Sequence, residues 1–215
     1  MRLLVTDDPE SLARIAASLV WARFVETPSA TLLFPGGRTP APLYERLASE
    51  GAALGIDLSA STLFDLDEYV GVSPGQDGSF ARQLRTELAD RPPFRSATID
   101  FFDGTADGEA ECARREFALR SAGGADLAIL GLGTDGHLAF NAPGTRFGTR
   151  TRLVDLPESM RASFRGEGPA PTRGLTVGLA TILDAKRILL LATGESKAPA
   201  LAAALEGRVD EGEPG

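Results

Sequence analysis

Short, continuous apolar runs alternate with amphipathic segments along most of this chain, and this alternation constrains its fold more than any other feature. The runs typical of strands buried on both faces are residues 30–34, 61–66, 98–102, 126–132, 175–179 and 187–193. The patterns with helical spacing are residues 9–24, 39–51, 79–90, 106–121 and 196–206. Together they predict an α/β fold, an open, mostly parallel sheet with helices on both faces (a Rossmann-like, three-layer α/β/α sandwich).

Length and composition limit the number of domains and the kind of partner. A chain of 215 residues with 43% hydrophobic residues can bury one full core, so we expect a single domain spanning residues 1–215. The net charge of −8 argues against a nucleic-acid partner and an anionic membrane surface, because both need clustered Lys and Arg. It allows a small anionic ligand, since a few cations can dominate one cleft.

The cysteine content and the hydropathy pattern bear on location. Cys112 is the only cysteine, which excludes an internal disulfide framework and favours a reducing environment. No apolar stretch approaches the length of a membrane-spanning helix. We therefore expect a cytoplasmic protein with no membrane partner, and a homo-oligomer is left open.

Ligands of open α/β sheets bind where strands lead into the next helix, and four such junctions carry unusual residues. The first is FPGGRTP, residues 34–40, where Thr39 suits a helix cap and Pro40 suits the first helical position. The turn at Gly36 and Gly37 would present unpaired N–H groups and the positive end of a helix dipole, an arrangement that binds phosphate. For two glycines alone an ordinary tight turn is the simpler interpretation, and the segment matches neither a dinucleotide nor a Walker fingerprint.

The second junction is DLDEYVGV, residues 65–72, which places Asp65, Asp67 and Glu68 directly after an apolar strand. Core packing gives no reason for carboxylates at this point. Crowded like charges in a cleft raise one another's pKa, which suits a general base. A solvated turn that caps the next segment explains these residues equally well.

The third junction is GLGTDGHLAFNAPG, residues 131–144, which holds the only histidine of the chain. Asp135 precedes His137 by two positions and can fix the ring and tautomer of the imidazole, the usual arrangement for a catalytic base. A lone histidine is more often structural. The glycine-rich turn after a buried strand, with Gly131 and Gly133, favours a functional role.

The fourth junction is TGESKAPALAAAL, residues 193–205, in which Lys197 opens a helix. A cation in the first turn opposes the helix dipole, so an early lysine favours an anionic partner; a surface lysine tolerated at small cost is the alternative. The Gly/Pro-rich stretch 164–174 is more typical of a loop or lid than of a domain boundary.

DLDEYVGV, GLGTDGHLAFNAPG, GLTVGLATILDA and TGESKAPAL together resemble the glucosamine-6-phosphate deaminase family, whose superfamily also contains the 6-phosphogluconolactonases. The resemblance runs in order from about residue 8 to residue 207. DEYVGV and LTVG are closer to the deaminases than to the lactonases. The resemblance implies an open α/β/α sandwich and an enzyme that acts on a small-molecule sugar phosphate and needs no metal or redox cofactor.

The resemblance also implies roles for individual residues. His137 would assist ring opening by moving the O5 proton, with Asp135 orienting its ring. Asp67 would shuttle a proton between C2 and C1, so that an amino-sugar 6-phosphate becomes the ketose 6-phosphate and ammonia. The residues expected at the phosphate are Gly36, Gly37, Arg38, Thr39, Arg165 and Lys197, and those expected around the sugar are Glu68, Gly131 and Gly133. Arg161 is the alternative to Arg165, because the alignment slips by a residue in MRASFRG.

Two residues depart from the family pattern. Ala142 stands where the family has a glutamate after Phe-Asn, part of the relay that tunes the histidine, so Asp135 or Glu167 would have to compensate. Arg38 occupies a position beside the phosphate that is usually small.

These departures keep two alternatives open. One is a lactone hydrolase of the 6-phosphogluconolactonase kind, in which His137 activates water. The other is a non-catalytic sugar-phosphate sensor. The DEYVG segment favours the deaminase over the hydrolase, and the intact Asp67, Asp135 and His137 favour an enzyme over a sensor.

Overall fold

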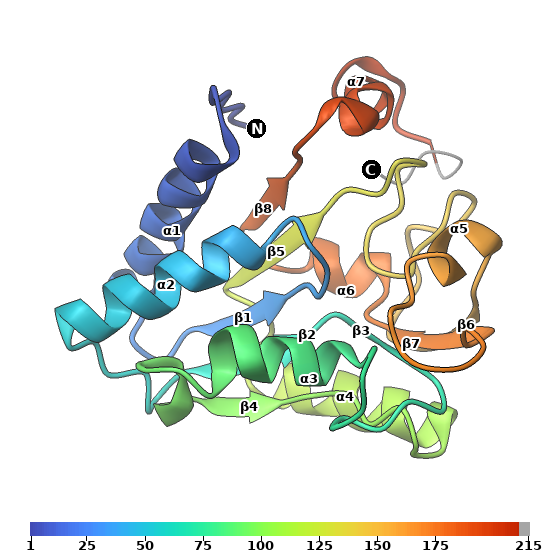
Figure 1. Cartoon of the computed structure of the whole chain (residues 1–215), viewed down its shortest axis with the longest axis horizontal. Coiled ribbons are helices and arrows are strands. Elements are labelled where there is room, and N and C mark those ends of the chain that lie inside the picture. Colours follow the sequence, from blue (N-terminus) through green and yellow to red (C-terminus); the bar gives the residue numbers. More distant parts are fainter. Residues whose placement is uncertain (211–215) are drawn as a thin grey trace.

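The computed structural model describes residues 1–210, and its centre is a five-stranded sheet in the order β4-β2-β1-β5-β8 (Figure 1). Its strands are β1 (Thr31–Phe34), β2 (Thr62–Asp65), β4 (Thr98–Asp100), β5 (Leu127–Gly131) and β8 (Ile188–Leu191). Every neighbouring pair is parallel. Because all five strands are parallel, their carboxyl ends lie at the same edge of the sheet.

Helices cover both faces of this sheet (Figure 1). The first face carries α1 (Pro9–Glu26), α2 (Ala41–Leu54), α3 (Phe80–Leu84), the π-helical turn η1 (Arg85–Ala89) and the 3-10 turn η2 (Phe94–Ser96). The second face carries α4 (Gly108–Ser121), α6 (Leu179–Leu183) and, after the 3-10 turn η3 (Glu195–Lys197), α7 (Ala198–Glu206). The helices of each face pack on the sheet to form one hydrophobic core. Leu32 and Phe34 of β1 point into the first core and Leu33 into the second, which is why the strand is apolar throughout. The predicted open α/β/α architecture is confirmed.

A second, antiparallel sheet of three strands was not predicted from the sequence. It has the order β3-β7-β6, with β3 (Asp67–Tyr69), β6 (Arg152–Asp155) and β7 (Arg173–Thr176), and the short helix α5 (Glu158–Arg161) follows β6. The apolar run 175–179, predicted as a strand of the parallel sheet, instead ends β7 and begins α6. Apolar residues alone do not show which sheet a strand joins, because both sheets bury them. The small sheet lies beside the carboxyl ends of the main strands (Figure 1).

Helix termini are only partly as predicted. The pattern beginning at residue 9 agrees with α1, whose first helical residue is Pro9, and Asp8 caps this helix by accepting the Ser11 N–H at 2.7 Å. In α2 the prediction is wrong, because the helix begins at Ala41 and no side chain caps it. No helix within residues 1–210 is both long and apolar enough to cross a bilayer.

Candidate active site

A cleft of about 640 Å³ lies at the carboxyl ends of the parallel strands. Its wall includes most of the residues singled out in the sequence, namely Gly36, Gly37, Arg38, Thr39, Asp67, Gly131, Gly133, His137, Arg165 and Lys197. Segments from four separate junctions therefore meet around one space. Glu68, Asp135 and Arg161 do not line it.

Asp67 presents its carboxylate to the cleft from the start of β3. The pairing of Asp67 with Thr176 fixes this strand immediately after β2 ends. Burial raises the pKa of Asp67 well above its ordinary value, and the nearby charges of Asp65 and Glu68 raise it further. A carboxylate with a raised pKa is a stronger base, so Asp67 suits proton abstraction.

Glu68 does not contribute to the cleft, contrary to the role expected around the sugar. It is fully buried on the opposite side of β3, where Oε2 accepts from the Ser79 hydroxyl at 2.6 Å and from the Ala81 N–H at 3.1 Å. Its Oε1 accepts from the Tyr69 N–H at 2.8 Å. Glu68 therefore holds the first turn of α3 against β3, because its carboxylate satisfies N–H groups that a helix start leaves unpaired.

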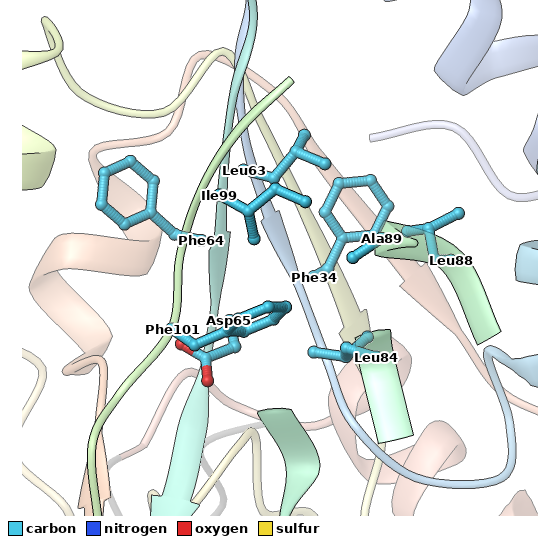
Figure 2. A pocket seen from close by; sticks show the side chains of 9 residues that line it. All are labelled: Phe34, Leu63, Phe64, Asp65, Leu84, Leu88, Ala89, Ile99 and Phe101. Atoms are coloured by element: carbon cyan, nitrogen blue, oxygen red, sulfur yellow. The ribbon is translucent and has the colours of Figure 1, made fainter. Parts of the chain in front are cut away.

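Asp65, two residues before Asp67, forms a buried ion pair with Arg115. Asp65 lies at one end of a small cavity of about 10 Å³ with otherwise apolar walls, separate from the cleft (Figure 2). The Arg115 guanidinium, from α4, donates to Asp65 Oδ1 at 2.5 Å, and the Phe102 N–H donates to the same oxygen at 3.1 Å. Burial raises the pKa of Asp65 to about 7 even though Arg115 opposes the shift.

His137 and Asp135 form a close pair on the loop after β5. His137 Nδ1 lies 2.5 Å from Asp135 Oδ1, which leaves Nε2 as the ring nitrogen free to meet a ligand. A Cβ on Gly133 would lie 2.2 Å from His137 Nδ1, so only glycine fits there. Burial works to raise the pKa of Asp135, but the charge of His137 and its hydrogen bonds outweigh burial and lower it. Asp135 thus remains a carboxylate that orients the ring.

Cationic side chains from three separate segments line the cleft wall. Arg38, Arg165 and Lys197 all line it in a chain whose net charge is −8. Burial lowers the pKa of Lys197, Asp135 raises it and the charge of Arg38 lowers it, with a net decrease. Of the two arginines left open by the sequence, Arg165 faces the cleft and Arg161 does not. An anionic ligand would relieve the repulsion between Arg38 and Lys197.

The glycine turn differs from the expected phosphate cradle. The Gly37 N–H is not unpaired, because it donates to Gln83 Oε1 at 3.0 Å. Gln83 comes from α3, 46 residues later in the chain, and no local pattern signals so distant a contact. Neither Gln83 nor Ser159, whose hydroxyl donates to Asp135 Oδ2 at 3.2 Å, was predicted from the sequence.

Ala142 lies outside the cleft. Its methyl group packs against the cluster formed by Tyr69, Val72, Phe140, Leu156 and Met160. Within residues 1–210, Asp135 is hydrogen-bonded to two side chains, those of His137 and Ser159. Neither Ala142 nor Glu167 takes part in this network. The same part of the chain contains no cluster of three or more His, Cys, Asp or Glu residues that could hold a metal ion.

The chain matches a family model described as glucosamine-6-phosphate isomerases/6-phosphogluconolactonase over residues 7–215. It is 37% identical over 214 residues to a glucosamine-6-phosphate deaminase of Arthrobacter sp. (strain FB24), covering 97% of this chain and 82% of that protein. It is 36% identical over 219 residues to a glucosamine-6-phosphate deaminase of Bacillus velezensis, covering 100% of this chain and 91% of that protein.

Two solved structures illustrate the likeness of fold. A monomeric glucosamine-6-phosphate deaminase has a TM-score of 0.94 and 34% identity, with 100% of this chain and 91% of that chain covered. A 6-phosphogluconolactonase from Shewanella baltica OS155 has a TM-score of 0.80 and 22% identity, with 97% and 88% covered. The second likeness concerns the fold alone.

Proposed function

This chain belongs to the family of glucosamine-6-phosphate isomerases and 6-phosphogluconolactonases, and we propose that it is an isomerising deaminase of glucosamine 6-phosphate or a related amino-sugar 6-phosphate. The observation that carries this proposal is the arrangement of one cleft. A buried carboxylate with a raised pKa, Asp67, and an oriented imidazole, His137, share its wall with the cations of Arg38, Arg165 and Lys197. The reaction class needs a base, a proton-transfer group and an anion site in one place.

Each part of the cleft supplies one step. His137 moves the proton of the ring oxygen O5, so that the sugar opens to its linear form. Asp67 then removes the proton from C2 and returns a proton to C1. The aldehyde oxygen O1 gains a proton and the amino nitrogen loses one, so that C1 becomes a hydroxymethyl group and C2 and its nitrogen form an imine. Water hydrolyses this imine to the ketose 6-phosphate and ammonia. Arg38, Arg165 and Lys197 hold the phosphate throughout, which fixes C1 and C2 relative to the base.

Ala142 also fits a second candidate function, that of a lactone hydrolase. A lactone hydrolase needs His137 and its orienting carboxylate to activate water, and it needs no further carboxylate at position 142. We propose the deaminase first because relatives 36–37% identical over at least 97% of the chain carry that name. A sensor that binds a sugar phosphate without turnover is the third candidate.

The test compares two substrates. The purified protein is incubated with glucosamine 6-phosphate and, separately, with 6-phosphogluconolactone, and ammonia release and lactone hydrolysis are measured. We expect ammonia release without added metal or nucleotide. Lactone hydrolysis without ammonia would support the hydrolase instead, and binding of either sugar without turnover would support the sensor.

The working unit is also part of the proposal. We propose that a single domain, residues 1–215, acts in the cytoplasm without a cofactor. A homo-oligomer remains compatible with this scheme, although the similar solved deaminase is described as monomeric. The side chains to which this scheme gives a step or a phosphate contact, Asp67, His137, Arg38, Arg165 and Lys197, all line the cleft of one copy of the chain.

Lys197→Ala should weaken the binding of phosphorylated sugars selectively. We expect a loss of about 1.5–3 kcal/mol, the range for a hydrogen bond to a charged group, and nearly no change for the unphosphorylated sugar. Titration calorimetry with glucosamine 6-phosphate and glucosamine measures both. Lys186→Ala is the matched control, because the only other lysine is paired with Asp126 and does not line the cleft. Equal losses for both sugars would remove Lys197 from the phosphate site.

The acidic limb of the pH–activity profile should report Asp67. We expect this limb well above the ordinary aspartate pKa of about 3.9, because burial raises the pKa of Asp67 and only the deprotonated form accepts a proton. Asp65→Asn removes a negative charge and leaves Arg115 with Asp100 as its remaining carboxylate partner. Both changes lower the pKa of Asp67, so the limb should move to lower pH.

The same profile is recorded for Asp77→Asn, which changes an exposed carboxylate of the cleft wall that is paired with Arg82. Circular dichroism confirms that each variant is folded across the pH range. A limb that stays fixed or moves upward in Asp65→Asn would show that Asp65 does not influence the base.

A further inference from the structure

The glycine turn between β1 and α2 is held by a side chain from another helix. The Gly37 N–H donates to Gln83 Oε1 at 3.0 Å, and Gln83 Nε2 donates to the Gly37 carbonyl oxygen at 2.9 Å. One side-chain amide thus pairs with both polar backbone groups of a single residue, as a neighbouring strand would. Gln83 and Gly37 both line the cleft.

The Gln83 amide is itself fixed in one orientation. Its nitrogen also donates to Glu87 Oε1 at 3.0 Å, one helical turn further along. The amide oxygen accepts from the Gly37 N–H, and the two N–H donors of the amide serve the Gly37 carbonyl and Glu87. A flipped amide would place its nitrogen against the Gly37 N–H and lose these hydrogen bonds. The contact with Gly37 therefore has a defined geometry.

The turn needs such support because its backbone is unusual. Gly37 has φ +98°, a left-handed conformation that few residues other than glycine adopt. A Cβ on Gly36 would lie 2.2 Å from the Phe80 ring, so α3 packs directly on the turn. Phe80 and Gln83 lie three residues apart on one helical face, so that Phe80 packs on Gly36 while Gln83 is hydrogen-bonded to Gly37. Residues 38–39 follow at once and line the cleft.

We propose that Gln83 is a positioning residue for the phosphate end of the cleft. It holds the Gly37 peptide so that Arg38 and Thr39 meet the phosphate group together with Lys197. The inference rests on the proposed function, because it takes the ligand to carry a phosphate. If phosphate took the Gly37 N–H, Gln83 Oε1 would lose its donor. The phosphate therefore binds beside the hydrogen bond between Gly37 and Gln83 and does not replace it.

Gln83→Met tests this role, since methionine has a similar length but neither donates nor accepts strongly. With inorganic phosphate as the probe, calorimetry should show affinity weakened about ten-fold, equivalent to about 1.4 kcal/mol. The KM for glucosamine 6-phosphate should rise by the same factor while kcat stays unchanged. Gln83→Glu keeps an acceptor for Gly37 but cannot donate to its carbonyl, and its charge opposes Glu87, so it should also weaken binding.

Two further measurements separate positioning from a general loss of structure. Exchange of the Gly37 amide hydrogen, followed by NMR in the free protein, should be faster in Gln83→Met than in the wild type whatever reaction the protein performs. Thr86→Val is the matched control, because Thr86 lies on the same wall and its hydroxyl donates to the backbone carbonyl oxygen of Arg82, one helical turn earlier. This variant should bind phosphate as the wild type does.

Opposite results would overturn the proposal. Tighter phosphate binding by Gln83→Met would mean that Gln83 competes with the ligand for the Gly37 N–H. Unchanged affinity together with faster Gly37 exchange would mean that the turn needs no support to bind phosphate. A wild type that releases no ammonia, with the phosphate and exchange results as expected, would overturn the proposed reaction and leave the role of Gln83 intact.

Discussion

Asp67→Asn should reduce ammonia release by about 10²–10⁴-fold, the range for removing a general acid–base group. The amide has nearly the size of the carboxylate but cannot accept the C2 proton. Because Asp67 is proposed as the base and not as a phosphate contact, the affinity for glucosamine 6-phosphate should change little. Single-turnover kinetics and calorimetry measure the two quantities separately.

Asp77→Asn serves as the control for this experiment, since it also removes a carboxylate from the cleft wall but leaves Asp67 in place. Its ammonia release should match that of the wild type. If Asp67→Asn still exchanges protons with solvent at C2 and C1 at the wild-type rate, Asp67 is not the base.

Arg115→Met should destabilise the protein by about 3–5 kcal/mol, the typical cost of removing one partner of a buried ion pair. The Arg115 guanidinium is almost fully buried, contacts Asp65 and Asp100, and lies 4.2 Å from the centre of the Phe102 ring. Removing it leaves the Asp65 carboxylate buried without its cation. Urea unfolding at fixed pH measures the free energy of unfolding.

The pH dependence of this loss identifies its cause. The folded-state pKa of Asp65 is about 7, above its unfolded value, so ionisation of Asp65 costs stability as the pH rises through that value. Without Arg115 this cost grows, and the difference between variant and wild type should widen above pH 7. Arg114→Met, which removes a half-exposed neighbour, should cost no more than about 1 kcal/mol. Equal losses for the two arginine variants would contradict a special role of the buried pair.

The parallel sheet was predictable because its strands are apolar on both faces. Leu32, Leu33 and Phe34 face two different cores, and only a strand covered by helices on both sides needs such a run. The small sheet left no comparable signal. Its strand β6 has the sequence RLVD, which reads equally as a loop, and β7 pairs with β3 across more than one hundred residues.

The site was predictable where a residue type is unusual for its position. A lone histidine beside an aspartate, and a lysine at the start of a helix, stood out in the sequence, and His137 and Lys197 both line the cleft. Glu68 was misplaced because neighbouring residues of a strand point to opposite sides, so Asp67 and Glu68 cannot both face the cleft. The sequence showed two adjacent carboxylates but not that β3 is a strand.

The contacts of Gln83 and Ser159 could not be predicted at all. Each depends on where a helix packs, and their partners lie 46 and 24 residues away in the chain. Glutamine and serine are ordinary residues in exposed helical segments, so neither type draws attention. Only the packing of α3 and α5 against the turns at the cleft gives these side chains a role.

The most direct test of the proposed reaction follows the C2–H bond itself. Glucosamine 6-phosphate carrying deuterium at C2 is incubated with the wild-type protein, and NMR follows the sugar while ammonia is assayed. We expect one ammonia for each ketose 6-phosphate formed, with deuterium lost from C2 in every molecule of product. Sugar recovered with the C2 deuterium intact and no ammonia, from a protein that hydrolyses 6-phosphogluconolactone, would contradict the account.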